Sequence, residues 1–320
     1  MDTLTHSGQA RRSTFTTADH TPLAVYDWPA AGPDAAARGT SGGTSGGTSR
    51  GTVLLVHGLG EHAGRYAPHA ARLNALGWSV RAYDQYGHGE SARLGAGRPG
   101  ALARDLQLPE HLAAIAGATR VAGADAAQAA GQAAGQAAGP LIVLGHSLGG
   151  LVAASAVSRG LLRPDGLVLS SPALAVDMAA WQRAAVSWLP RLAPGLTLGN
   201  GVKPQFLSHD PAVVAGYQAD PLVHDRICTR LGAFVAQEGE QVCAAAARWS
   251  VPTLLLYAGD DRLVSPRGSR AFAATAEAAG APVQSRCFGT LYHEIFNEPE
   301  PTDPGDSPFR ALATWLDARA

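Results

Sequence analysis

The sequence has little of what marks several classes of protein. Its three cysteines, Cys228, Cys243 and Cys287, include no Cys-x-x-Cys spacing, which fits a reducing compartment and argues against a disulfide framework or a zinc site. No apolar run approaches the length of a membrane-spanning helix, and residues 1–12 lack the apolar segment of a secretory signal peptide. We therefore expect a cytoplasmic protein with no bound metal and no integral membrane segment.

Charge of one sign is not in excess either. The chain has 25 basic and 26 acidic residues and a formal net charge of −1, and Lys203 is its only lysine. Such a balance gives no reason to expect binding to nucleic acid or attraction to an anionic membrane. The hydrophobic fraction of 46% in 320 residues allows a full core, in one large α/β domain or two small ones.

Segments with the pattern of strands alternate with segments of helical pattern, which predicts a mostly parallel sheet with helices on both faces. A polar turn between two short apolar segments, 13–16 and 23–28, predicts an N-terminal hairpin that adds antiparallel edge strands. The further strands are expected at 53–57, 79–83, 141–144, 166–170, 253–257 and 283–287. The helices are expected at 64–76, 105–122, 151–157, 269–279 and 309–318.

Residues 172–249 interrupt the alternation. They are rich in Trp, Leu and Pro, have helical stretches at 178–189 and 225–247, and contain little that indicates a strand. Because this region lies between two strands of one sheet, we interpret it as a helical cap over the carboxyl ends of the strands, where ligands bind in such folds. The core is then expected in two parts, 13–171 and 250–320.

Two tracts of low complexity stand apart from this pattern. Residues 30–51 consist mainly of Ala, Gly, Ser, Thr and Pro, and residues 128–139 repeat Gln-Ala-Ala-Gly. The first cannot bury apolar surface, so we expect a flexible loop. The second mixes helix-forming alanine with glycine, which predicts a fraying helix end or a loose connection.

The segment Gly145-His146-Ser147-Leu148-Gly149 lies between an apolar strand and a helix. This is the context in which Gly-x-Ser-x-Gly forms a nucleophile elbow, a tight turn that lifts the serine hydroxyl out of the sheet. The glycines are needed where a Cβ would collide with neighbouring backbone. The turn also aims the Leu148 N–H at the position of an oxyanion. A glycine-rich turn that serves packing alone is the other interpretation.

A serine nucleophile needs a base, and the base needs an orienting carboxylate. In this architecture the chain order is Ser, then Asp or Glu, then His. Asp260 and Asp261 both follow the strand at 253–257, and His293 follows the strand at 283–287. His209 and His224 lie in the cap region and end no strand of the sheet, so they suit the role less well.

The second oxyanion donor is expected in the loop after the first core strand, residues 57–62. Gly58 and Gly60 permit unusual backbone angles there, so the Leu59 N–H can point into the site. His57 and His62 precede the serine and are expected to hold this loop. Asp84, after the next strand, is expected to accept hydrogen bonds from local backbone N–H groups.

Six motifs occur along the chain in one order. They are His57-Gly58-Leu59-Gly60-Glu61-His62 followed by Gly64-Arg65-Tyr66, residues 84–91, residues 145–150, Asp220-Pro221-Leu222-Val223, Asp261-Arg262-Leu263-Val264, and Tyr292-His293-Glu294. Together they resemble the monoacylglycerol lipase and lysophospholipase branch of the α/β-hydrolases, from about residue 13 to the C-terminus outside the two low-complexity tracts. Those tracts are longer than the family pattern leads us to expect.

The resemblance implies an α/β-hydrolase fold with a catalytic triad of Ser147, Asp261 and His293. It implies an oxyanion hole formed by the N–H groups of Leu59 and Leu148, a helical cap with an apolar acyl channel, and no cofactor. The acyl and alcohol specificity is not carried over, because the cap is the part in which family members differ most.

The predicted function is hydrolysis of carboxylic esters, foremost monoacylglycerols or lysophospholipids, through an acyl-enzyme on Ser147. The alternatives are a short-chain carboxylesterase, an acyltransferase or thioesterase with the same triad, and a catalytically silent fold used for binding. A haloalkane dehalogenase or epoxide hydrolase is disfavoured, because those enzymes have an aspartate at the elbow.

The cap supplies more apolar surface than a lid needs for its own packing. We expect Trp181, Trp188 and Leu189 to contact the acyl chain of a small-molecule ester, and we expect the cap to allow transient contact with lipid. The interpretation left open is that these side chains only pin the cap to the sheet domain and leave a small pocket for short esters.

Overall fold

The computed structural model describes residues 9–30, 49–129 and 139–319. Most of the two low-complexity tracts, predicted as a flexible loop and a loose connection, lie outside the described residues. None of the helices in the described ranges combines the length and the apolar character needed to cross a membrane.

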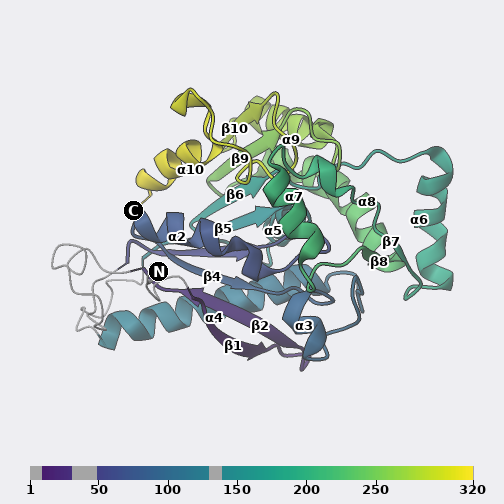
Figure 1. Cartoon of the computed structure of the whole chain (residues 1–320), viewed down its shortest axis with the longest axis horizontal. Coiled ribbons are helices and arrows are strands. Elements are labelled where there is room, and N and C mark those ends of the chain that lie inside the picture. Colours follow the sequence, from purple (N-terminus) through teal and green to yellow (C-terminus); the bar gives the residue numbers. More distant parts are fainter. Residues whose placement is uncertain (1–8, 31–48, 130–138, 320) are drawn as a thin grey trace.

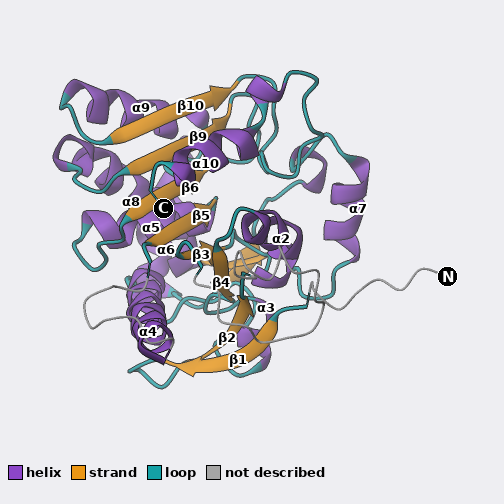
Figure 2. Ribbon diagram, turned by 90° about the vertical axis from the view of Figure 1, so that its left-hand side faces the viewer, coloured by secondary structure: helices purple, strands orange, loops and turns teal. Residues whose placement is uncertain are grey.

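An eight-stranded sheet forms the centre of the molecule, in the order β1-β2-β4-β3-β5-β6-β9-β10 (Figure 2). β2 pairs antiparallel with both β1 and β4, and all other neighbours are parallel. The predicted parallel sheet with an N-terminal hairpin at its edge is therefore confirmed. The strands are β1 (Arg11–Thr16), β2 (Pro22–Trp28), β3 (Thr52–Val56), β4 (Ser79–Tyr83), β5 (Leu141–His146), β6 (Gly166–Ser170), β9 (Thr253–Ala258) and β10 (Val283–Phe288).

Helices cover both faces of the sheet. On one face α2 and α10 bury Leu73, Leu312 and Trp315 against the strands, and on the other α4, α5 and α9 bury residues such as Leu112 and Phe272. The bounds are α2 (Ala67–Ala75), α3 (Gly89–Arg93), α4 (Gln107–Ala129), α5 (Leu148–Ser158), α9 (Pro266–Ala278) and α10 (Pro308–Asp317).

The central strands are buried on both faces, which is why their sequences are apolar without alternation. Every residue of β5, β6 and β9 is buried. Because parallel strands end at the same edge of a sheet, the loops after β3, β5, β9 and β10 meet there. These four loops contain Leu59, Ser147, Asp261 and His293.

The region 172–249 contains more structure than its sequence indicated. Its elements are α6 (Ala180–Leu192), β7 (Thr197–Gly199), a 3-10 turn η2 (Pro204–Phe206), α7 (Pro211–Ala219), β8 (Arg226–Cys228), α8 (Thr229–Ala245) and a 3-10 turn η3 (Ala246–Arg248). β7 and β8 form a separate two-stranded antiparallel sheet. Helix α6 lies at the outer end of the molecule, on the right of Figure 1. Helix α8 packs on α5 and α9 and so extends the helical layer of the core.

Two of the differences between predicted and observed helix bounds have a local cause. The segment predicted as one helix at 64–76 is a 3-10 turn η1 (Ala63–Tyr66) followed by α2, whose first turn contains Pro68. Helix α4 continues to Ala129 and does not end at 122. Its last turns are rich in alanine, which has the highest helix propensity.

Candidate active site

Ser147 stands at a sharp turn between β5 and α5. Its backbone has φ 54° and ψ −118°, a conformation that costs free energy in a residue with a side chain. A Cβ on Gly145 would lie 2.4 Å from the carbonyl oxygen of Gly149, and a Cβ on Gly149 would lie 2.1 Å from that of Val56. The two glycines are therefore required by backbone contact, and the turn has the form predicted for a nucleophile elbow.

Asp261 and His293 meet beside this turn, in the loops after β9 and β10. The Nδ1 atom of His293 lies 2.6 Å from Oδ2 of Asp261, and both side chains are at most 5% exposed. The other carboxylate oxygen of Asp261 accepts hydrogen bonds from the N–H groups of Leu263 and Val264, at 2.9 and 3.0 Å. These two donors fix the carboxylate, so its remaining oxygen faces the imidazole.

The neighbouring carboxylate is placed differently. The Asp260 side chain is 43% exposed and accepts hydrogen bonds from the guanidinium of Arg262, at 3.1 and 3.0 Å. Of the two aspartates that the sequence pattern left open, Asp261 is the one in contact with His293.

The pKa values of Asp261 and His293 reflect two opposing effects, burial of each side chain and the charges beside it. Burial alone would lower the pKa of His293, but Asp261, its hydrogen bond and then the nearby carboxylate of Glu294 outweigh burial and raise it above the ordinary 6.5. Burial would raise the pKa of Asp261, but His293 and the N–H groups of Val264 and Leu263 lower it. The arrangement favours an ionised Asp261 and an imidazole more basic than an ordinary histidine.

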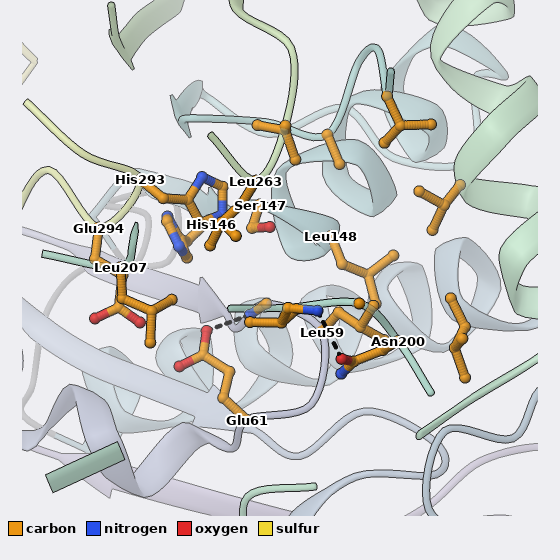
Figure 3. A pocket seen from close by; sticks show the side chains of 18 of the residues that line it. Leu59, Glu61, His146, Ser147, Leu148, Asn200, Leu207, Leu263, His293 and Glu294 are labelled. Carbon is orange, nitrogen blue, oxygen red and sulfur yellow. Dashed lines mark hydrogen bonds between the residues drawn. The ribbon is translucent and has the colours of Figure 1, made fainter. Parts of the chain in front are cut away.

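Ser147, His293, Leu59 and Leu148 line one cavity of about 170 Å³ (Figure 3). Its lining is partly apolar and partly polar. Apolar lining comes from Val176, Val202, Leu207, Ile227, Val235, Leu263 and Val264. Polar lining comes from Glu61, Asn200, Tyr217 and Glu294.

The backbone N–H groups of Leu59 and Leu148 have no hydrogen-bond partner among the described residues. Both residues line the cavity with Ser147, and their N–H groups stay the predicted oxyanion donors. The loop that presents Leu59 is fixed from two sides. His57 Nδ1 lies 2.8 Å from the Gly58 carbonyl oxygen, and His57 Nε2 accepts the N–H of Gln85 at 3.0 Å.

The other groups expected to hold these loops do so. Complete burial lowers the pKa of His57 to about 3, so its ring is neutral and serves as a structural bridge. His62 Nε2 lies 2.8 Å from Asp220 in the region after β6. Asp84 accepts hydrogen bonds from the N–H groups of Ala63 and Glu90, both at 2.7 Å.

The two histidines considered less suitable as bases lie outside the cavity lining. His209 Nδ1 is 3.0 Å from Glu298, and its ring stacks on Tyr292 at 3.7 Å. His224 Nε2 lies 3.1 Å from the carbonyl oxygen of Gly87, and its backbone N–H donates to the carbonyl oxygen of Gly60 at 2.8 Å.

The predicted acyl contacts are not where the sequence suggested. Trp181 and Trp188 are 72% and 66% exposed, and neither they nor Leu189 line the cavity. The reason is the position of α6, which packs on α8 at the outer end of the molecule and turns these tryptophans to solvent. The cavity wall comes instead from shorter aliphatic residues of the loops and of α8.

Sequence reasoning assigned no role to three charged residues at this site, Glu61, Arg65 and Glu294. All three occur in motifs quoted above, and Glu294 is adjacent to His293. The sequence signal that could have indicated a role was the position of Glu294 directly after the candidate base His293. Within the described ranges, no group of three or more His, Cys, Asp or Glu side chains could hold a metal ion.

A serine at an elbow and a buried Asp–His pair, both at the carboxyl edge of a mostly parallel sheet, define a hydrolase-type site of the α/β-hydrolase class. A family model described as serine aminopeptidase, S33 (Hydrolase_4) matches residues 47–300. Since this match covers most of the chain, the protein belongs to that family.

Curated relatives cover most of the chain. A monoacylglycerol lipase of Mycolicibacterium smegmatis is 36% identical over 255 residues, which are 78% of this chain and 82% of that protein. A monoglyceride lipase of Rattus norvegicus is 26% identical over 274 residues, 83% of this chain and 82% of that protein. An uncharacterised abhydrolase domain-containing protein of Dictyostelium discoideum is 30% identical over 250 residues, 77% of this chain, which spans only 24% of that longer protein.

Solved structures show the same fold. The monoacylglycerol lipase of Paleococcus ferrophilus superposes with a TM-score of 0.69 at 30% identity, over 98% of this chain and 100% of that one. A soluble variant of monoglyceride lipase from Saccharomyces cerevisiae gives a TM-score of 0.76 at 18% identity, over 100% of this chain and 98% of that one, and supports the fold alone. The α/β-hydrolase fold is thus confirmed, and with these relatives the protein is an ester hydrolase.

Proposed function

We propose that this protein hydrolyses monoacylglycerol-type esters through an acyl-enzyme on Ser147, with His293 as general base and Asp261 as its orienting carboxylate. The observation that carries the proposal is the buried hydrogen bond of 2.6 Å between Asp261 and His293, at a cavity that Ser147 also lines. The monoacylglycerol and monoglyceride lipases among the relatives support the choice of substrate.

The proposed chemistry follows from the donors and acceptors around the cavity. The Ser147 hydroxyl attacks the ester carbonyl carbon while His293 Nε2 takes its proton, and Asp261 accepts the Nδ1–H of the resulting imidazolium. The Leu59 and Leu148 N–H groups bind the oxyanion. The imidazolium then protonates the leaving alcohol, and a water molecule, activated by the same base, releases the fatty acid.

The two kinds of lining residue match the two parts of such an ester. The aliphatic lining residues, which include Val202, Ile227 and Val235, suit an acyl chain, and Asn200 and Tyr217 suit hydroxyl groups of the alcohol. Each methylene group buried contributes about 0.8 kcal/mol. A single-chain ester with a small polar alcohol, such as a monoacylglycerol, therefore uses both kinds of lining residue.

One observation favours a second candidate, a short-chain carboxylesterase. A cavity of about 170 Å³ is smaller than the roughly 300–1,000 Å³ of most small-molecule pockets. A long acyl chain needs space beyond this volume, which displacement of the cap would have to provide. Chain-length dependence separates the two candidates.

Residues 172–249 are the proposed cap, and its helix α6 is the proposed lipid-contact surface. Trp181, Trp188 and Leu192 lie at spacings of seven and four residues on one face and are 66–81% exposed. The neighbouring Arg183 and Arg191 are also exposed. An exposed stripe of this kind, with arginines beside it, is typical of helices that lie at a lipid surface.

The three cysteines are unpaired, which supports the cytoplasm as the proposed compartment.

The test combines one variant with one substrate series. Ser147→Ala should abolish ester hydrolysis with the fold retained, and a fluorophosphonate probe should label Ser147 in the wild type and leave the variant unlabelled. Labelling at another residue, or activity retained in the variant, would contradict the mechanism. Across monoacylglycerols of increasing length, kcat/KM should rise up to at least eight carbons, whereas a maximum at acetate or butyrate would identify a short-chain carboxylesterase.

A further inference from the structure

A buried group of three charges lies beside the proposed catalytic residues and takes no part in the mechanism above. The Arg65 guanidinium donates to Glu61 through Nη1 and to both carboxylate oxygens of Glu294, at 2.9 and 3.1 Å. The three side chains are 12%, 4% and 6% exposed. Taking three charges out of water is costly, and apolar residues would often stabilise a fold better. Their presence at this site therefore calls for a functional reason.

Glu61 connects the guanidinium to the oxyanion loop. Its Oε1 atom accepts the N–H of Gly58 at 2.5 Å, the bond that the dashed line at Glu61 marks in Figure 3. The same oxygen accepts the hydroxyl of Tyr66 at 2.7 Å. Gly58 immediately precedes Leu59, so the position of Glu61 helps to set the direction of the Leu59 N–H.

Glu294 connects the same guanidinium to the histidine loop. It follows His293 directly in the chain, and its backbone N–H donates to the Leu207 carbonyl oxygen at 2.8 Å. Its Oε2 atom also accepts the side-chain amide of Asn297 at 2.7 Å. Because backbone and side chain of Glu294 are both held, a shift of Arg65 would be passed on to the His293 imidazole.

We propose that Arg65 and Glu294 are positioning residues, and that the planar Arg65 guanidinium sets the distance between the oxyanion donor Leu59 and the base His293 by binding Glu61 and Glu294 at once. This inference rests on the proposed function and adds to it a connection between two parts of the site that lie far apart in the sequence. Both parts must be correctly placed in the same transition state, and a misplacement of about 1 Å costs about 100-fold in rate.

The group also has an electrostatic effect on the base. The charged and titratable groups around His293 are Asp261, Glu294, Glu61, Arg65 and His146, whose ring centroid is 4.8 Å away. Replacing Glu294 by glutamine removes one negative charge and leaves the other groups in place. The pKa of His293 should then fall, and the acid limb of the pH–rate profile should move to lower pH.

Substitutions that separate geometry from charge test the proposal. Arg65→Lys keeps the positive charge, but a point ammonium cannot bind two carboxylates as the planar fork does. We expect kcat to fall about 10- to 100-fold, by the misplacement argument above, with KM within about twofold and the acid limb unmoved. Glu294→Gln should lower kcat and also shift the acid limb to lower pH. Arg72→Lys, at the exposed pair of Arg72 and Glu300, is the matched control and should keep wild-type kcat.

The readouts distinguish this proposal from its alternatives. Each variant is assayed with a water-soluble p-nitrophenyl ester, its melting temperature is measured, and its rate of fluorophosphonate labelling is compared with that of the wild type. A lower melting temperature with unchanged kcat and labelling rate would overturn the proposal and leave a purely structural ion pair. An Arg65→Lys enzyme as active as the Arg72→Lys control, or an unmoved acid limb in Glu294→Gln, would also overturn it. Failure of the proposed function would appear separately, as absence of labelling at Ser147 in the wild type.

Discussion

The hydrogen bonds around Asp261 allow a sharp prediction for Asp261→Asn. One carboxylate oxygen accepts two backbone N–H groups, those of Leu263 and Val264. An asparagine at 261 must keep its carbonyl oxygen at that position, because an amide NH₂ there would face two donors. Its NH₂ group is then directed at His293 Nδ1, where Asp261 Oδ2 now lies 2.6 Å away.

This orientation fixes the wrong tautomer of the base. With an NH₂ donor facing it, Nδ1 must be the acceptor, so the proton of the neutral imidazole sits on Nε2. A protonated Nε2 cannot take the proton of Ser147. The loss expected for such a change is about 10⁴-fold in kcat, or about 5.5 kcal/mol of transition-state stabilisation.

The assay is steady-state hydrolysis of a p-nitrophenyl ester, with thermal unfolding as the check on the fold. Asp260→Asn is the matched control: it changes the adjacent, exposed carboxylate, which contacts Arg262 and not His293. The control should keep activity within about threefold, since it leaves every hydrogen bond of the triad in place. A smaller loss in Asp261→Asn than in Asp260→Asn would refute the reasoning and assign the carboxylate role to Asp260.

Two further predictions concern the pH profile and the lipid-contact surface. The base must be neutral to accept a proton, and the pKa of His293 is raised above 6.5. We therefore expect kcat/KM to fall as the pH is lowered through a value above 6.5. A pH–rate profile with its acid limb below pH 6 would contradict this. Replacing Trp181 and Trp188 together by serine should weaken co-sedimentation with phosphatidylcholine vesicles about 100-fold or more, because burying one large apolar side chain is worth about 1.5–3 kcal/mol. Hydrolysis of soluble p-nitrophenyl acetate should stay unchanged in this variant, and equal vesicle binding would exclude α6 as the contact surface.

The sheet could be predicted because its signals are local. Strands buried on both faces, such as 141–146 and 253–258, are short apolar runs between helices, and the alternation fixes a parallel sheet. The elbow around Ser147 was recognisable because backbone contact requires glycine at fixed positions. His293 followed from its place after the last strand, but the choice between Asp260 and Asp261 needed the family pattern.

The region 172–249 could not be predicted to the same depth, because its structure depends on long-range contacts. The strands β7 and β8 have three residues each, and their pairing reaches across 31 positions of sequence at its widest, between Thr197 and Cys228. Exposure of Trp181 and Trp188 depends on where α6 lies relative to the core, which no periodicity indicates. The contact between Arg65 and Glu294 spans 229 positions, so no local pattern in the sequence indicates that these two residues meet.

The backbone conformation of Ser147 also bears on how this protein can be stabilised. A residue with a side chain at φ 54° and ψ −118° carries a strain of about 1–3 kcal/mol that glycine would relieve. Alanine keeps the Cβ and therefore keeps the strain, so it tests the hydroxyl alone. Selection for thermal stability without selection for activity would favour glycine at 147, and the resulting protein would be more stable and inactive. At this position the fold holds its proposed nucleophile at the expense of its own stability.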